Sequence, residues 1–144
     1  MTLFRPDYRL TDDAVQLLIE AARAAAARMG VPQCIAVVDQ GCNLLGFLRM
    51  DGARVLSIES ATRKAMTSAV TGAPSGELPA SKSGALAAAT DGRMTGLPGG
   101  LPIHVQGCLV GGIGIGSGKG EEDLVVAQAA IAALTAVLAR GEGL

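Results

Sequence analysis

One histidine and three cysteines are the side chains of this chain best suited to metal binding or nucleophilic chemistry. His104 stands four residues before Cys108, and the residues between them are predicted to form a tight turn. An imidazole and a thiol in this arrangement could share a metal ion, or act as base and nucleophile. Zinc spacing of the C-x-x-C or H-x-x-H type is absent. We therefore keep His104 as a candidate metal ligand or catalytic residue and Cys108 as a candidate catalytic residue, beside the alternative that His104 is an ordinary packed or surface residue.

Three cations, Arg49, Arg63 and Lys64, form the main positive group in the middle of the chain. Arg63 could pair with Glu59 one helical turn away, and Arg49 stands beside Asp51. Two interpretations follow from these residues. In the first, the three cations lie on a solvated face and form local ion pairs. In the second, they hold the carboxylate of a ligand, since arginine binds carboxylates through two parallel hydrogen bonds.

Asp39 closes a predicted buried strand, which makes it a candidate catalytic acid or base. The sequence allows a second role equally well. An aspartate ahead of Gly41 commonly accepts hydrogen bonds from its own backbone and so fixes a turn.

A glycine-rich stretch, GGLPIHVQGCLVGGIGIGSGKGEED, begins at Gly99. Gly118 and Lys119 are followed by glycine instead of the Ser or Thr of a Walker A loop, and the dinucleotide spacing G-x-G-x-x-G fails in every register. Acidic residues at the following helix start would also repel a bound anion. The glycines are therefore predicted to serve backbone geometry and to admit a close neighbour.

Apolar periodicity and turn residues divide the chain into helices and two hairpins. Residues 73–100 are predicted to form a long loop with at most a short helix at 81–90, and such loops are usually functional or mobile. Hairpins in place of βαβ crossovers imply an antiparallel sheet with helices packed on it, an α/β fold of the α+β type in a single domain over residues 1–144. We expect helices at about 11–29, 57–72 and 121–140, and strands at 33–39, 43–50, 101–105 and 108–115.

Composition excludes several classes of function. The 144 residues carry a formal net charge of −1, and the chain has no tryptophan and no basic block, so nucleic-acid binding is not expected. The chain lacks an apolar run of signal-peptide or membrane-spanning length, so we expect a cytoplasmic protein with no membrane partner. Three cysteines give no disulfide framework. Alanine-rich helices offer a modest core, so we expect a homo-oligomer that buries further apolar surface.

Three blocks together resemble the GlcG/HbpS family, which includes the C-terminal domain of PduO-type proteins. They are VVDQGCNLLGFLRMDGA (37–53), ATRKAMTSA (61–69) and the glycine-rich stretch from 99 to 123. The resemblance spans about residues 11–140 and implies a profilin-like antiparallel sheet of about five strands, homo-oligomers, and the binding, sensing or degradation of haem. The matching motif positions are Asp39, Gly41, Arg49, Met50, Asp51, Lys64, Gly99, Gly100, Pro102, Gly107, Gly111, Gly114, Gly118 and Asp123. Two positions depart from the family pattern: Cys42 stands where D-x-G-G is usual, and Met66 where an aromatic residue is frequent.

Two functional hypotheses follow from the resemblance. A haem- or tetrapyrrole-binding protein would hold propionates with Arg49, Arg63 or Lys64 and approach the iron with His104, a methionine such as Met66, or a cysteine. Gly99 and Gly100 are further candidate ligand-binding positions. The alternative is a small enzyme for a carboxylate-bearing metabolite, with its site near the 73–100 loop. In that case Lys64 and Arg49 would hold the substrate, and Asp39, His104 or Cys108 would move protons. An accessory oligomer without catalysis is a third interpretation.

Overall fold

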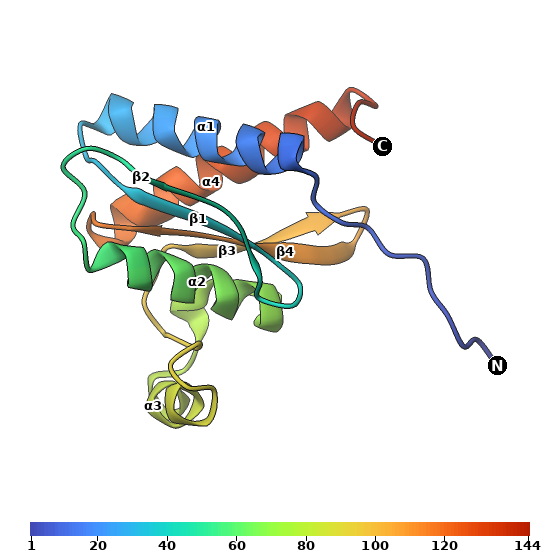
Figure 1. Cartoon of the computed structure of the whole chain (residues 1–144), viewed down its shortest axis with the longest axis horizontal. Coiled ribbons are helices and arrows are strands. Elements are labelled where there is room, and N and C mark those ends of the chain that lie inside the picture. Colours follow the sequence, from blue (N-terminus) through green and yellow to red (C-terminus); the bar gives the residue numbers. More distant parts are fainter.

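The computed structural model describes residues 1–144 as three layers built around one sheet (Figure 1). The predicted α+β class is confirmed, with four strands in place of about five. The sheet has the order β2-β1-β4-β3, and every neighbouring pair is antiparallel. In chain order the elements are α1 (Asp12–Met29), β1 (Cys34–Asp39), β2 (Leu44–Arg49), α2 (Ser57–Thr71), the 3-10 helix η1 (Ser75–Glu77), α3 (Ala80–Ala89), β3 (Gly100–Val105), β4 (Cys108–Gly116) and α4 (Gly120–Ala139).

Helices α1 and α4 lie side by side on one face of the sheet and enclose the larger core (Figure 1). The hydroxyl of Thr11 caps α1 by accepting the N–H of Ala14 at 3.2 Å, and Gly30 ends the helix with φ 68°. By length and composition alone, α4 could cross a membrane, since its mean hydropathy reaches 1.7. A helix that packs against a protein core meets the same criteria, and α4 contributes Val126, Ala127, Ala130 and Leu134 to the core. The buried residues of this layer are Val15, Leu18, Ala22, Ala25, Ala26, Ile35, Val37, Ile103, Val105, Val110, Ile113, Ile115, Val126, Ala127, Ala130 and Leu134.

Helix α2 covers the opposite face and rests with its backbone directly on β4. A Cβ added at Gly112 would meet the carbonyl oxygen of Ala65, and one added at Gly114 would meet that of Ala61. Side chains on these strand positions would hold a helix several ångströms further out. The glycine-rich stretch therefore admits a helix at backbone contact, which agrees with the close neighbour predicted for it.

The segment between α2 and β3 contains the short helix predicted at 81–90, observed as α3 at Ala80–Ala89, and the further turn η1. Helix α3 projects away from the other layers with no buried residue (Figure 1). A single hydroxyl group joins the two ends of this segment. The Ser75 hydroxyl donates to the carbonyl of Leu97 at 2.6 Å and accepts the N–H of Gly100 at 2.9 Å. The two ends of the segment from Ser75 to Gly100 are thus held together, while α3 between them stays exposed.

Candidate functional site

A cleft of about 360 Å³ lies between the β1–β2 turn, the outer side of α2 and the segment that follows α3. Three of its side chains carry sulfur: Cys42, Met66 and Met94. We call it the sulfur-lined cleft. Its remaining lining residues are Val70, Ala89, Thr90, Asp91 and Arg93.

The β1–β2 turn positions Cys42. One carboxylate oxygen of Asp39 accepts the N–H groups of Gly41 at 2.8 Å and Asn43 at 2.9 Å, which closes the turn. Cys42 takes a left-handed conformation with φ 63°. Its thiol then reaches α2, where Sγ donates to the carbonyl oxygen of Met66 at 3.7 Å.

Thr67 holds the opposite wall against α2, and Thr90 fixes that wall internally. The Thr67 hydroxyl donates to the carbonyl of Arg63 at 2.8 Å and accepts the N–H of Thr95 at 2.9 Å. The Thr90 hydroxyl accepts the N–H of Met94 at 3.2 Å. These bonds fix the chain around Met94, whose side chain is buried.

Charges of both signs stand at the cleft, since its lining contains both Arg93 and Asp91. Arg93 lines it, and Arg63 donates to Met66 Sδ at 3.6 Å while it pairs with Glu59 at 3.4 Å. Burial raises the pKa of the Cys42 thiol, and the nearby charge of Arg93 offsets this only in part, so the thiol is protonated at neutral pH. The guanidinium groups of Arg63 and Arg93 can bind the carboxylates of a ligand, while Glu59 and Asp91 offset part of their charge.

Backbone strain also gathers at the cleft. Four residues other than glycine have positive φ, and two of them, Cys42 and Asp91, line it. Gln106 is accounted for by its two-residue hairpin turn, where positive φ is required. A left-handed residue other than glycine costs on the order of 1 kcal/mol and is typical of ligand sites.

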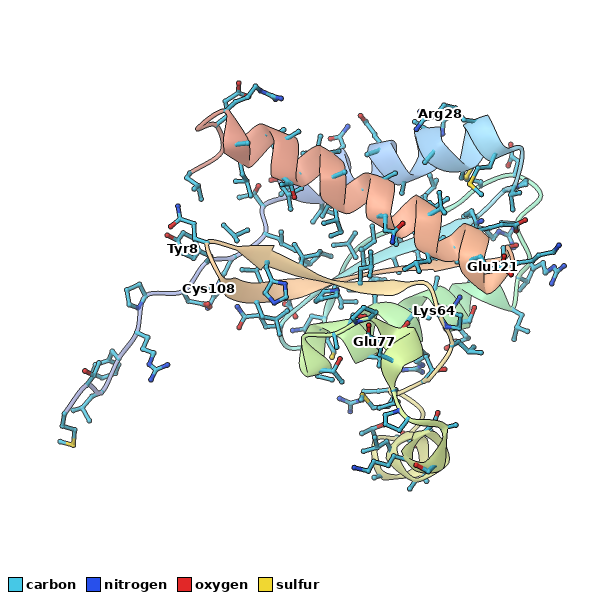
Figure 2. All side chains as sticks on the ribbon, turned by 180° about the vertical axis from the view of Figure 1, so that it is seen from behind. Tyr8, Arg28, Lys64, Glu77, Cys108 and Glu121 are labelled. Atoms are coloured by element: carbon cyan, nitrogen blue, oxygen red, sulfur yellow. The ribbon has the colours of Figure 1, made fainter.

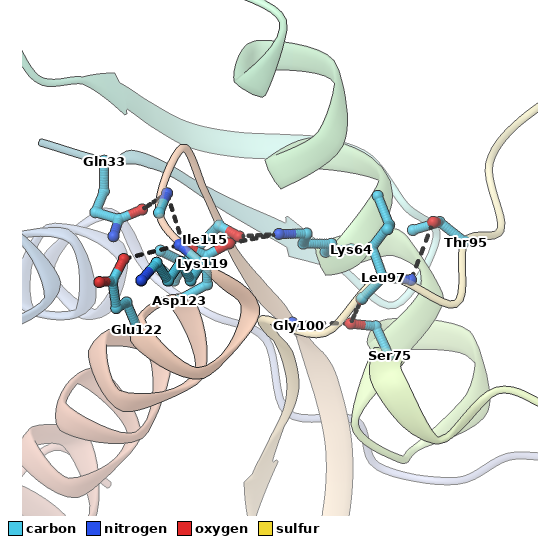
Figure 3. Close-up of polar contacts among 11 residues, drawn as sticks. Gln33, Lys64, Ser75, Thr95, Leu97, Gly100, Ile115, Lys119, Glu122 and Asp123 are labelled. Carbon is cyan, nitrogen blue, oxygen red and sulfur yellow. Dashed lines mark hydrogen bonds and ion pairs between the residues drawn. The ribbon is translucent and has the colours of Figure 1, made fainter. Parts of the chain in front are cut away.

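Lys64 lies in a separate, buried cluster (Figure 3). Its Nζ donates to Asp123 Oδ2 and to the carbonyl of Ile115, both at 2.7 Å, and Asp123 Oδ1 accepts the N–H of Gly118 at 3.0 Å. The ion pair joins α2, β4 and α4. Gly99 approaches so closely that an added Cβ would stand 3.1 Å from Lys64 Nζ.

Three predicted ligand-binding residues, Lys64, Gly99 and Gly100, thus meet, but around a carboxylate of the protein itself. A Cβ on Gly100 would overlap the carbonyl of Lys64. Arg63 lies at the outer side of α2, and exposed Arg49 ends the edge strand β2. The three predicted cations therefore do not form one carboxylate clamp within the chain.

His104 and Cys108 are not brought together either. Cys108 pairs with Val105 across the hairpin, so these two side chains share the face covered by α1 and α4. His104 is adjacent to Val105 and points to the opposite face. Cys108 and Lys64 lie toward opposite ends of β4 (Figure 2). The chain has no group of three His, Cys, Asp or Glu side chains that could hold a metal ion.

Sequence reasoning missed Arg93 and Met94 in this site. Both belong to the segment where the apolar pattern is weak, and nothing in their spacing connects them with Met66. The sequence pointed to the cleft at two positions, Cys42 and Met66, both of which depart from the family pattern.

The turn carboxylate makes a pH-dependent contribution to stability. Burial alone would raise the pKa of Asp39, but the hydrogen bonds from Asn43 and Gly41 outweigh it and hold the pKa below its ordinary value. A carboxyl with a lowered folded pKa stabilises the fold above its unfolded pKa, and this stability is lost as the pH falls through the folded pKa. We expect Asp39→Ala to cost about 1 kcal/mol at pH 7, and the difference to vanish in acid. Urea unfolding of both proteins from pH 7 to pH 2 measures it, and a constant difference would contradict this role.

Comparisons with known proteins found a family model and several solved structures that resemble this chain. The family described as haem degrading protein HbpS-like matches residues 10–132. Protein ORFY of Klebsiella pneumoniae has a similar structure, with TM-score 0.89 and 26% identity over 94% of this chain and 97% of that one. A structure described as a PduOC–heme complex has TM-score 0.81 and 30% identity over 88% of this chain and 95% of the other.

The match to a longer protein covers only part of it. The corrinoid adenosyltransferase PduO of Citrobacter freundii is 31% identical over 90% of this chain, but the match covers 40% of PduO. Its adenosyltransferase activity therefore does not transfer to this chain on the strength of that likeness.

Proposed function

Because the chain belongs to the HbpS-like family of haem degrading proteins, we propose that it binds haem or a related tetrapyrrole in the sulfur-lined cleft. The observation that carries the proposal is the donor set of this cleft. Thiol and thioether sulfurs are known ligands of haem iron, and here three of them line one cavity beside two guanidinium groups.

The residues of the cleft fit the parts of such a ligand. Val70, Ala89 and the buried side chain of Met94 offer apolar surface for a macrocycle. Arg63 and Arg93 can bind propionates through paired hydrogen bonds. A volume of about 360 Å³ is enough for part of a tetrapyrrole and leaves the propionate edge in solvent. The bound group would supply a redox-active iron.

A charge placed in the cleft tests this assignment. Val70 lines the cleft and is 53% exposed, so Val70→Glu adds a carboxylate to the apolar wall with little effect on folding. We expect the chain to bind hemin saturably, one per chain, and Val70→Glu to weaken binding at least about tenfold, or 1.4 kcal/mol. Titration followed by the Soret absorbance measures both affinities.

The matched control is Val125→Glu on α4, because Val125 is 51% exposed and does not line the cleft. It should bind hemin with unchanged affinity. Equal weakening by the two variants would place the ligand elsewhere, and no saturable binding by the parent chain would contradict the function.

We also propose that the chain assembles as a homo-oligomer in the cytoplasm. Exposed apolar side chains at Val55, Leu56 and Ile58 precede and begin α2, where a second copy would cover them.

A further inference from the structure

Cys42 occupies a backbone position that glycine fills at lower cost. Asp39 N–H donates to the carbonyl of Asn43 at 3.0 Å, so the β1–β2 connection is a three-residue loop. The third residue of such a loop is left-handed, usually glycine, and here it is Cys42 with φ 63°. A side chain at this position carries strain that a glycine would not.

The left-handed backbone conformation of Cys42 directs its thiol into the sulfur-lined cleft. Cys42 Sγ lies against the backbone of Met66, and Met66 and Met94 line the same cavity. The other two cysteines differ. Cys34 is fully buried under α2, and Cys108 is exposed at the tip of the β3–β4 hairpin. Only Cys42 combines strain, a cleft and neighbouring sulfurs.

The single histidine cannot serve this cleft within one chain. His104 lies on β3, and Cys42 lies in the loop that leads into β2, so they belong to opposite sides of the sheet. Two strands and the helix α2 stand between them, which corresponds to about 14 Å of backbone separation across the sheet. Within one chain, the donors that the cleft offers an iron are the sulfurs of Cys42, Met66 and Met94 and the carboxylate of Asp91, and of these a cysteine thiolate and a methionine thioether are established haem ligands.

We propose that Cys42 is the protein ligand of the iron of haem bound in the sulfur-lined cleft, an inference that rests on the function proposed above. On binding ferric haem, Cys42 gives its thiol proton to solvent and exchanges its hydrogen bond to Met66 for a sulfur–iron bond. No electron is transferred in this step. Met66, which Arg63 holds through its sulfur, stays beside the ligand as an apolar wall.

Cys42→Gly separates this role from a structural one. The variant removes the sulfur and also relieves the strain, so we expect its melting temperature to rise by about 3 °C. Its hemin affinity should fall at least about tenfold, and the thiolate signature in the optical and electron paramagnetic resonance spectra of the ferric complex should disappear. Cys42→Ser, which keeps a side chain in the strained position, should lose the same signature without the rise in melting temperature.

The controls are His104→Ala and Met66→Leu, which should keep the thiolate signature. A parent spectrum that persists in Cys42→Gly would overturn the assignment while leaving haem binding intact. A spectrum changed by Met66→Leu or His104→Ala but not by Cys42→Gly would assign the iron to that residue instead. Absence of saturable hemin binding by the parent chain would contradict the proposed function itself, and the ligand assignment with it.

Discussion

Gly114→Ala is expected to destabilise the fold by at least about 3 kcal/mol, or to prevent folding altogether. The added methyl group would overlap the carbonyl oxygen of Ala61 and stand close to the backbone N of Ala65. Both are main-chain atoms in the middle of α2, so neither can move away without displacing the helix. Among the glycines of the chain, Gly114 is the one at which an added Cβ would come closest to another atom.

Chemical denaturation measures this effect, with Gly84→Ala as its matched control. Gly84 lies within α3, has ordinary helical φ, and has nothing within 4 Å of an added Cβ. Alanine is the better helix former by about 0.5–1 kcal/mol, so Gly84→Ala should be more stable than the parent chain. A Gly114→Ala protein that lost less than about 1 kcal/mol would contradict direct backbone contact between α2 and β4.

Lys64→Met is expected to cost about 3–5 kcal/mol, because it leaves the buried Asp123 carboxylate without its cation. It also removes the side-chain ammonium that donates to the Ile115 carbonyl. The double variant Lys64→Met with Asp123→Leu replaces both charges by apolar groups and should recover much of the loss. Unfolding free energies of the parent, the two single variants and the double variant give the coupling between the pair.

Glu59→Gln is the control on the same helix. It breaks the exposed pair with Arg63, at 3.4 Å, and should cost less than about 0.5 kcal/mol. If Lys64→Met cost no more than this, the ammonium would be available for a ligand, as the sequence suggested. With a large cost and unchanged hemin affinity of the folded variant, the role of Lys64 is to join three elements of the fold.

The elements with strong local signals were predicted closely. The first helix has its threonine cap, acidic first turn and terminal glycine, and its observed bounds are Asp12–Met29. Both hairpins lie where the alternation of turn and apolar residues predicted them. Helix α3 was the least certain element, because it buries no residue and so needs no apolar face that a sequence pattern could reveal.

The number of strands was predicted more accurately from the residue pattern than from the family resemblance. Periodicity alone predicted four strands, and the structure has four. The estimate of about five came from the family resemblance. The N-terminal residues before α1 form no strand, and their side chains are largely exposed.

The candidate site was predictable only in part, because tertiary structure alone assembles it. Met66 was a candidate ligand-binding residue, and Cys42 was noted only because it departs from the usual D-x-G-G. Met94 joins them because the Thr67 hydroxyl ties the neighbouring Thr95 to α2, while the Thr90 hydroxyl accepts the Met94 N–H within a segment of weak pattern. No local signal links residues so far apart in the chain.

Glycine has a further consequence at β4, for the order in which the chain folds. A strand with glycine at positions 112, 114 and 116 has low intrinsic strand propensity and gains little from side-chain packing on that face until α2 arrives. Docking of α2 on β4 closes a loop of about fifty residues, and the chain loses this conformational entropy before the contact between the two elements stabilises it. The central strand of the sheet should thus be completed late in folding, and the hairpin of β1 and β2 together with α1 should form first.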